Sequence, residues 1–147
     1  MTDKRESILA RLVTVCEGVT GIRSARRNST DISEQHAPYI VVYDGDETAD
    51  DGDPQGRPRG SVRLVRMTPE IYLVTTGASD GLGTTINGFR ASIINAILTD
   101  ATLAGLTVNG QGIRYDGCST GLSKGTKPIG QVGLSFSFTY TIGPYSA

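Results

Sequence analysis

The chain has 147 residues, a length that fits one domain and leaves no room for separate catalytic and regulatory modules. Its 14 basic and 15 acidic residues give a net charge of -1, which argues against a nucleic-acid binder, because neutralising phosphates requires a concentrated basic surface. No apolar run approaches the roughly 20 residues of a membrane span, and the charged residues 2–6 are unlike a secretory signal. We therefore expect a soluble, loop-rich protein that stays in the compartment where it is made.

The first predicted element is a helix over residues 3–18. Asp3 is a candidate N-cap, Glu6 follows three residues later as in a capping box, and Gly18 supplies a stop. Cys16 falls on the packed face, where a small inert thiol is expected. That face has helical spacing and consists of Ile8, Leu9, Leu12, Val13 and Cys16.

Three strands are predicted in the next part of the chain. Residues 22–27 form a short one, and the β-branched and aromatic residues 37–43 form a clearer one. Residues 62–76 form a long strand whose middle Pro69 demotes to a bulge or an edge, because proline has no N–H to donate. One face of this strand carries Val65, Met67, Ile71 and Leu73.

Residues 44–60 are predicted to be a long, mobile hairpin loop. This segment contains four glycines, two prolines and six acids, so it has too few apolar side chains to form a core of its own. The acids precede a block of arginines, and the two blocks can partly neutralise each other across a hairpin. The order of acids does not match an EF-hand, so a solvated loop is favoured over a cation site. The charged residues of the loop are Asp44, Asp46, Glu47, Asp50, Asp51, Asp53, Arg57 and Arg59.

The second half of the chain begins with a helix over residues 84–98, whose apolar stripe is Leu82, Ile86, Phe89, Ile93 and Ile97. Asp100 is predicted to cap one more turn. A hairpin-type turn at Asn109-Gly110 leads to a short strand at 113–115, and residues 117–130 are expected to be a loop. Residues 131–142 alternate cleanly and predict a half-buried strand. The order indicates an α+β fold with an antiparallel or mixed β-sheet and two helices packed on one face.

Several patterns resemble catalytic sites, and each has a simpler interpretation. Residues 76–83, TGASDGLG, resemble the nucleotide-binding turn of short-chain dehydrogenases, but too few residues follow it for the remaining βαβ units, and no Tyr-x-x-x-Lys base is present. A glycine-rich turn between a strand and a helix is therefore predicted. His36 precedes a strand and is expected to be a solvent-facing or structural histidine rather than a general base. Cys118, in a predicted loop, has no histidine partner beyond His36 that would make it a nucleophile. Lys124 and Lys127 mark a basic contact loop or an exposed turn rather than a phosphate loop.

Six segments together resemble the tail terminator proteins of tailed bacteriophages, of the lambda minor tail protein U type. They cover almost the whole chain: ILARL at 8–12, PYIVVYDGDE at 38–47, MTPEIY at 67–72, LTD at 98–100, IRYDGC at 113–118 and GLSFSFTY at 133–140. The resemblance implies a single domain over residues 1–147 without catalytic residues or cofactors. It implies a ring, usually of six subunits, in the neck of the virion, where it caps the tail tube, stops its growth and offers the surface to which the filled head attaches.

The resemblance also implies partners: further copies of the chain, the tail tube protein and the head-to-tail connector proteins. DNA would pass through the ring without specific binding, and acidic side chains facing the channel would repel its phosphates. In the competing arrangement the acidic loop lies outside and contacts the tube or connector. A head-to-tail connector or stopper protein is the alternative function, and a nicotinamide-dependent oxidoreductase is a remote one.

Overall fold

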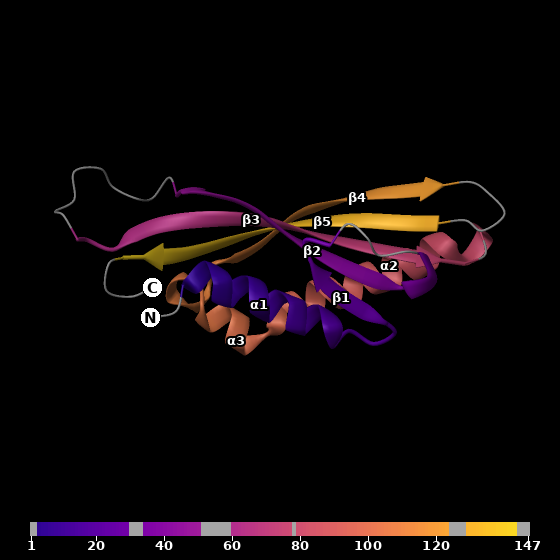
Figure 1. The fold of residues 1–147 in the computed structure, drawn as a ribbon, viewed down its shortest axis with the longest axis horizontal. Helices are drawn as coiled ribbons and strands as arrows, with labels where there is room; N and C mark the ends of the chain where they lie inside the picture. The colour runs from indigo at the N-terminus through magenta and orange to yellow at the C-terminus, as the bar shows by residue number, and fades with distance from the viewer. Residues whose placement is uncertain (1–2, 30–33, 51–59, 78, 124–128, 144–147) are drawn as a thin grey trace.

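The computed structural model describes residues 3–29, 34–50, 60–77, 79–123 and 129–143. Five strands form one mixed sheet in the order β1-β2-β3-β5-β4, with β1 parallel to β2 and the other neighbours antiparallel. Helices cover one face of this sheet, and within the described ranges no helix lies on the other face (Figure 1). The strands are β1 Ser24–Arg27, β2 Tyr39–Ala49, β3 Arg63–Thr76, β4 Ile113–Ser123 and β5 Ile129–Ile142. The predicted α+β class with helices on one face is confirmed.

Two long helices and one short helix form the second layer. They are α1 Lys4–Glu17, α2 Ser79–Thr99 and α3 Ala101–Gly105, and two short 3-10 turns, η1 Glu34–His36 and η2 Val108–Gly110, complete the fold. Asp3 and Gly18 cap α1 as predicted. Asp100 caps α3 by accepting from the Leu103 N–H, and it also accepts two hydrogen bonds from Arg11 of α1, at 2.7 and 2.9 Å. This pair joins the first helix to the second half of the chain.

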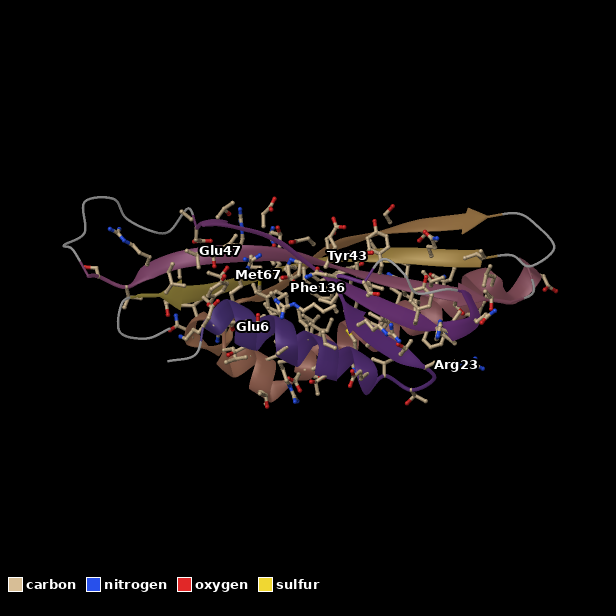
Figure 2. The ribbon with its side chains drawn as sticks, viewed as in Figure 1. Glu6, Arg23, Tyr43, Glu47, Met67 and Phe136 are labelled. Carbon is tan, nitrogen blue, oxygen red and sulfur yellow. The ribbon has the colours of Figure 1, made fainter. Side chains whose placement is uncertain are left out.

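The core lies between the sheet and the helices, and the predicted apolar faces supply it. On β5 the side chains from Val132 to Tyr140 at every second position are fully buried, and on β3 the four predicted residues are at most 7% exposed. Figure 2 shows Met67 and Phe136 between the two layers. Cys16 is fully buried in the same cluster, and burial raises the pKa of its thiol to about 12. The inert role predicted for this thiol matches that environment.

The predicted loop 44–60 is too long at its start. Strand β2 continues to Ala49, because residues 46–49 pair with residues 65–68 of β3. The prediction of a loop over 117–130 was wrong in its first half for the same reason, since β4 runs to Ser123 along the edge of β5. In both places, pairing with a strand distant in sequence extends a segment whose own residues have low strand propensity.

Two turn predictions also change. Residues 76–83 were predicted to be a glycine-rich turn between a strand and a helix, but helix α2 begins at Ser79, so Gly81 and Gly83 lie inside the helix. Asn109 and Gly110 both have positive φ and form a turn as predicted, but the turn links α3 to β4 and does not join two strands. A dinucleotide turn of the dehydrogenase kind is therefore not formed here.

Candidate assembly surfaces

Asp44, predicted to lie free in an acidic loop, is tied into the fold. Arg27 of β1 donates from Nε to Asp44 Oδ1 at 2.7 Å and from Nη2 to Oδ2 at 2.9 Å, and from Nη1 to Glu6 of α1 at 2.6 Å. The hydrogen bonds from Arg27 lower the pKa of both Asp44 and Glu6. One guanidinium therefore joins β1, β2 and α1, and Asp44 has a structural role in this junction.

A β-bulge next to Asp44 is built on Gly45. The register of β2 against β3 shifts between Tyr43 and Asp46, opposite Pro69. Of the two irregularities predicted at Pro69, a bulge or an edge, the structure shows a bulge, because β3 is a central strand of the sheet. Gly45 has φ +69, and a Cβ there would lie 2.1 Å from the carbonyl oxygen of Thr68. Only glycine fits this position. Arg5 Nη2 donates to the Gly45 carbonyl at 2.8 Å, which holds the bulge against α1.

Beyond the bulge, the acids of β2 divide between the two faces of the sheet. Glu47 accepts a hydrogen bond from the hydroxyl of the buried Tyr140, on the side of the helices. Burial and the Glu47 carboxylate raise the pKa of Tyr140. Asp46 pairs in register with the exposed Thr68, so it lies on the face without helices. Asp46 is thus the exposed acid of β2 on that face, and Asp50 follows directly after the strand.

Six of the predicted contact residues lie outside the described residues. They are Asp51, Asp53, Arg57 and Arg59 of the hairpin tip and Lys124 and Lys127 of the connection between β4 and β5. Their assignment to a channel or contact loop stays a prediction.

Asp116 is a further acid on β4, which the sequence did not single out. The register of β4 shifts between Tyr115 and Gly117, and this second bulge contains Asp116. Its carboxylate accepts from Arg114 Nε at 2.6 Å and from the Ser137 hydroxyl. Burial raises the pKa of Asp116, but the hydrogen bonds from Ser137 and Arg114 outweigh that effect and the pKa is lowered. Asp116 therefore stabilises the edge of the sheet.

Cys118, predicted to lie in a loop, is an exposed residue of the edge strand β4. Hydrogen bonds from Tyr115 and Arg90 lower the pKa of its thiol, and the Arg90 guanidinium lies over the Tyr115 ring at 5.9 Å. His36 is exposed at the end of η1, as predicted. Among the described residues, no group of three or more His, Cys, Asp or Glu side chains is placed to hold a metal ion.

A hollow that the sequence did not predict lies on the face of the sheet without helices. It has a volume of about 460 Å³ and is lined by uncharged residues: Ser29, Tyr39, Val41, Tyr43, Tyr72, Val74 and Gln131. The rings of Tyr43 and Tyr72 meet edge to face with centroids 5.6 Å apart, and Tyr72 remains 38% exposed. The alternation of Tyr39, Val41 and Tyr43 along one strand was the signal, because it places three bulky side chains on the second face.

Comparison with known proteins gives likenesses of fold only. No family model and no curated protein matches the chain. A solved protein without a descriptive name matches at 16% identity and a TM-score of 0.48, over 94% of this chain and 96% of that one. The sheath/tube terminator of an extracellular contractile injection system, PVC, matches at 9% identity and a TM-score of 0.47; 98% of this chain is covered, and it spans 58% of that chain. At such scores neither likeness decides the function.

Among the described residues, no helix is both long and apolar enough to cross a membrane.

Proposed function

We propose that the chain is a structural subunit of a phage tail, which forms a ring on the end of the tail tube, stops its growth and provides the surface for head attachment. The proposal rests on the sequence resemblance to tail terminators and on one structural observation, that the two edges of the sheet differ. Among the described residues, neither the outer edge of β1 nor that of β4 pairs with another strand. The first edge has 4 residues and the second has 11.

Different edges suit a ring better than a dimer. A two-fold dimer uses the same patch on both subunits, whereas a closed ring needs two different surfaces that match. The subunit has two pairs of different surfaces: a short sheet edge and a long one, and a face with helices and a face without them (Figure 1). The charged side chains described above bind other residues of the same chain and stabilise the fold, as expected of a structural subunit.

The part of the hairpin beyond the bulge is proposed to approach the channel. We call the end of β2 from residue 46 with the following Asp50, together with residues 63–68 of β3, the arm; Figure 1 shows this end of the sheet reaching past the start of α1. Asp46 is exposed on the helix-free face of the arm, and Asp50 follows at its end. Carboxylates at this position would repel the phosphates of passing DNA and keep it from adhering.

Electron microscopy of the purified protein, alone and mixed with tail tubes, tests the ring. Rings alone, or caps on tubes that otherwise continue to grow, are the expected result. Protomers that stay single at high concentration and beside tubes would overturn the proposal. Binding to the head connector without any effect on tube length would favour the alternative, a connector or stopper protein.

Neutralisation of the arm tests the channel. Particles carrying Asp46→Asn and Asp50→Asn in the arm, together with Asp51→Asn and Asp53→Asn in the residues that follow it in the sequence, are expected to assemble normally and eject DNA more slowly. Glu17→Gln, which removes an exposed acid at the end of α1, is the matched control and should leave ejection unchanged. Unchanged ejection in the arm variant would rule out the channel position, and failure at head joining would place the arm outside.

A further inference from the structure

The outer surface of α2 lacks charge along almost its whole length. Asp80 in the first turn and Arg90 are the charged residues of this 21-residue helix, and Arg90 lies over Tyr115. Leu98 is 44% exposed on this surface. The other exposed side chains after Asp80 are small or uncharged: Thr84, Thr85, Asn87, Ala91, Ser92, Asn95 and Thr99. The exposed face of a helix that meets only water usually carries charged residues, so this one resembles the core of an interface.

The tyrosine-lined hollow is a second uncharged surface, on the opposite layer of the molecule. The described residues that line it are uncharged, while Arg26 and Glu70 border it in register with Val41 and Tyr43. Val41 and Val74 are 3% and 7% exposed without belonging to the core between the layers. Tyrosines are enriched at interface centres, where they combine large contact area with a hydrogen-bonding group. Leu98 and Tyr72 are two of the three large hydrophobic side chains exposed in the described residues, and Val62 is the third.

We propose that the α2 surface of one copy docks onto the tyrosine hollow of the next copy. The two surfaces lie on opposite layers of one chain, so they meet only between different copies (Figure 1). The described residues that line the hollow are uncharged, and α2 carries only Asp80 and Arg90, so contact between the two surfaces strips few charges of water, which matches one to the other and disfavours a charged partner. Each copy gives one surface and receives the other, and such a head-to-tail contact closes into a ring when the rotation between copies allows.

This inference rests on the proposed function and adds the faces that hold the ring together. Contact through the hollow leaves the arm free, because the residues of β2 that line the hollow precede the bulge at Gly45, whereas the arm follows it. A partner of another chemistry, such as a membrane or a charged peptide, is not the proposed occupant. The occupant is a second copy of this chain.

Four single variants test the contact by sedimentation velocity and electron microscopy. Leu98→Asp and Ala91→Arg place a charge on the α2 surface, and Tyr72→Asp places one in the hollow. Each is expected to weaken self-association at least about tenfold, because the charge would have to be buried without a partner. Val62→Asp is the matched control, since Val62 is 40% exposed outside both surfaces, and it should assemble like the unchanged chain. Circular dichroism confirms that each variant is folded.

Mixing the variants shows whether the two surfaces meet each other. Leu98→Asp keeps an intact hollow and Tyr72→Asp keeps an intact helix, so together they should form a one-to-one pair that grows no further. If folded variants assemble like the unchanged chain, or if two single variants do not pair when mixed, the inference is overturned while the ring proposal stands. If the unchanged chain stays single even with tail tubes, the proposed function fails and the inference fails with it.

Discussion

Arg27 and Asp44 bind each other through two parallel hydrogen bonds, from Nε at 2.7 Å and from Nη2 at 2.9 Å, while the third arginine nitrogen binds Glu6 at 2.6 Å. The side chains of Arg27 and Asp44 are 29% and 27% exposed, so the pair is only partly screened by water. The pair links β1 to β2 next to the bulge in β2, and the bond to Glu6 attaches this point to α1. The sequence separation within the pair, 17 residues, explains why no local pattern reveals it.

Removing the arginine should destabilise the fold. Arg27→Ala leaves Asp44 and Glu6 without their partner, and we expect the free energy of unfolding to fall by about 1 kcal/mol. Arg27→Lys keeps the charge but loses the two-pronged geometry, so it should recover only part of that stability. Urea unfolding followed by circular dichroism measures both. A lysine variant as stable as the unchanged chain would show that charge alone matters here.

The same pairs predict how stability depends on pH. Hydrogen bonds from Arg27 and Arg11 lower the folded-state pKa of Asp44 and Asp100. A carboxyl group with a lowered pKa stabilises the fold fully above its unfolded pKa of about 4, and this contribution is lost as the pH falls through the folded value. The free energy of unfolding should therefore stay level from about pH 7 to pH 5 and decrease below about pH 4. Arg27→Ala should show a shallower decrease; an equally steep one would contradict the assignment to Asp44.

Substitution of Gly45 tests whether the β-bulge requires glycine. Gly45→Ala places a Cβ 2.1 Å from the Thr68 carbonyl oxygen at a residue with φ +69, so strand pairing has to break or shift. We expect a loss of more than about 2 kcal/mol in the free energy of unfolding. Gly83→Ala is the control, because no atom lies within 4 Å of its added Cβ on α2, and it should stabilise by about 0.5 to 1 kcal/mol. Similar effects of the two substitutions would refute the bulge.

How much of this fold the sequence predicts depends on whether a segment's own pattern or a distant partner decides its structure. Residues 3–18 and 131–142 carry complete helical and alternating patterns, and α1 and β5 form where these predict. Residues 44–49 and 117–123 are rich in acids, glycine and serine, and they become strands because β3 and β5 offer backbone partners. The tyrosine hollow likewise exists only once β2 and β3 are neighbours.

The alternating pattern of β5 places its phenylalanines in the core and predicts that each contributes strongly to the free energy of unfolding. Phe136 and Phe138 are fully buried with ring centroids 6.3 Å apart. Phe136→Ala and Phe138→Ala should each lower the free energy of unfolding by about 3 to 5 kcal/mol through lost burial and a residual cavity. Ser135→Ala, on the opposite face of the same strand, should change it by less than about 0.5 kcal/mol. Thermal melting that is unchanged in either phenylalanine variant would contradict the face assignment.

The two cysteines should differ in reactivity, because their environments shift the thiol pKa in opposite directions. Burial raises the pKa of Cys16 to about 12, whereas hydrogen bonds from Tyr115 and Arg90 lower that of the exposed Cys118. A disulfide reagent at pH 7 should therefore modify one thiol per folded chain and the second only after denaturation. Arg90→Gln should raise the pKa of Cys118 and slow its modification at pH 7, while Cys118→Ser should abolish the fast reaction. Fast modification that survives in Cys118→Ser would place the reactive thiol at Cys16 and contradict its burial in the core.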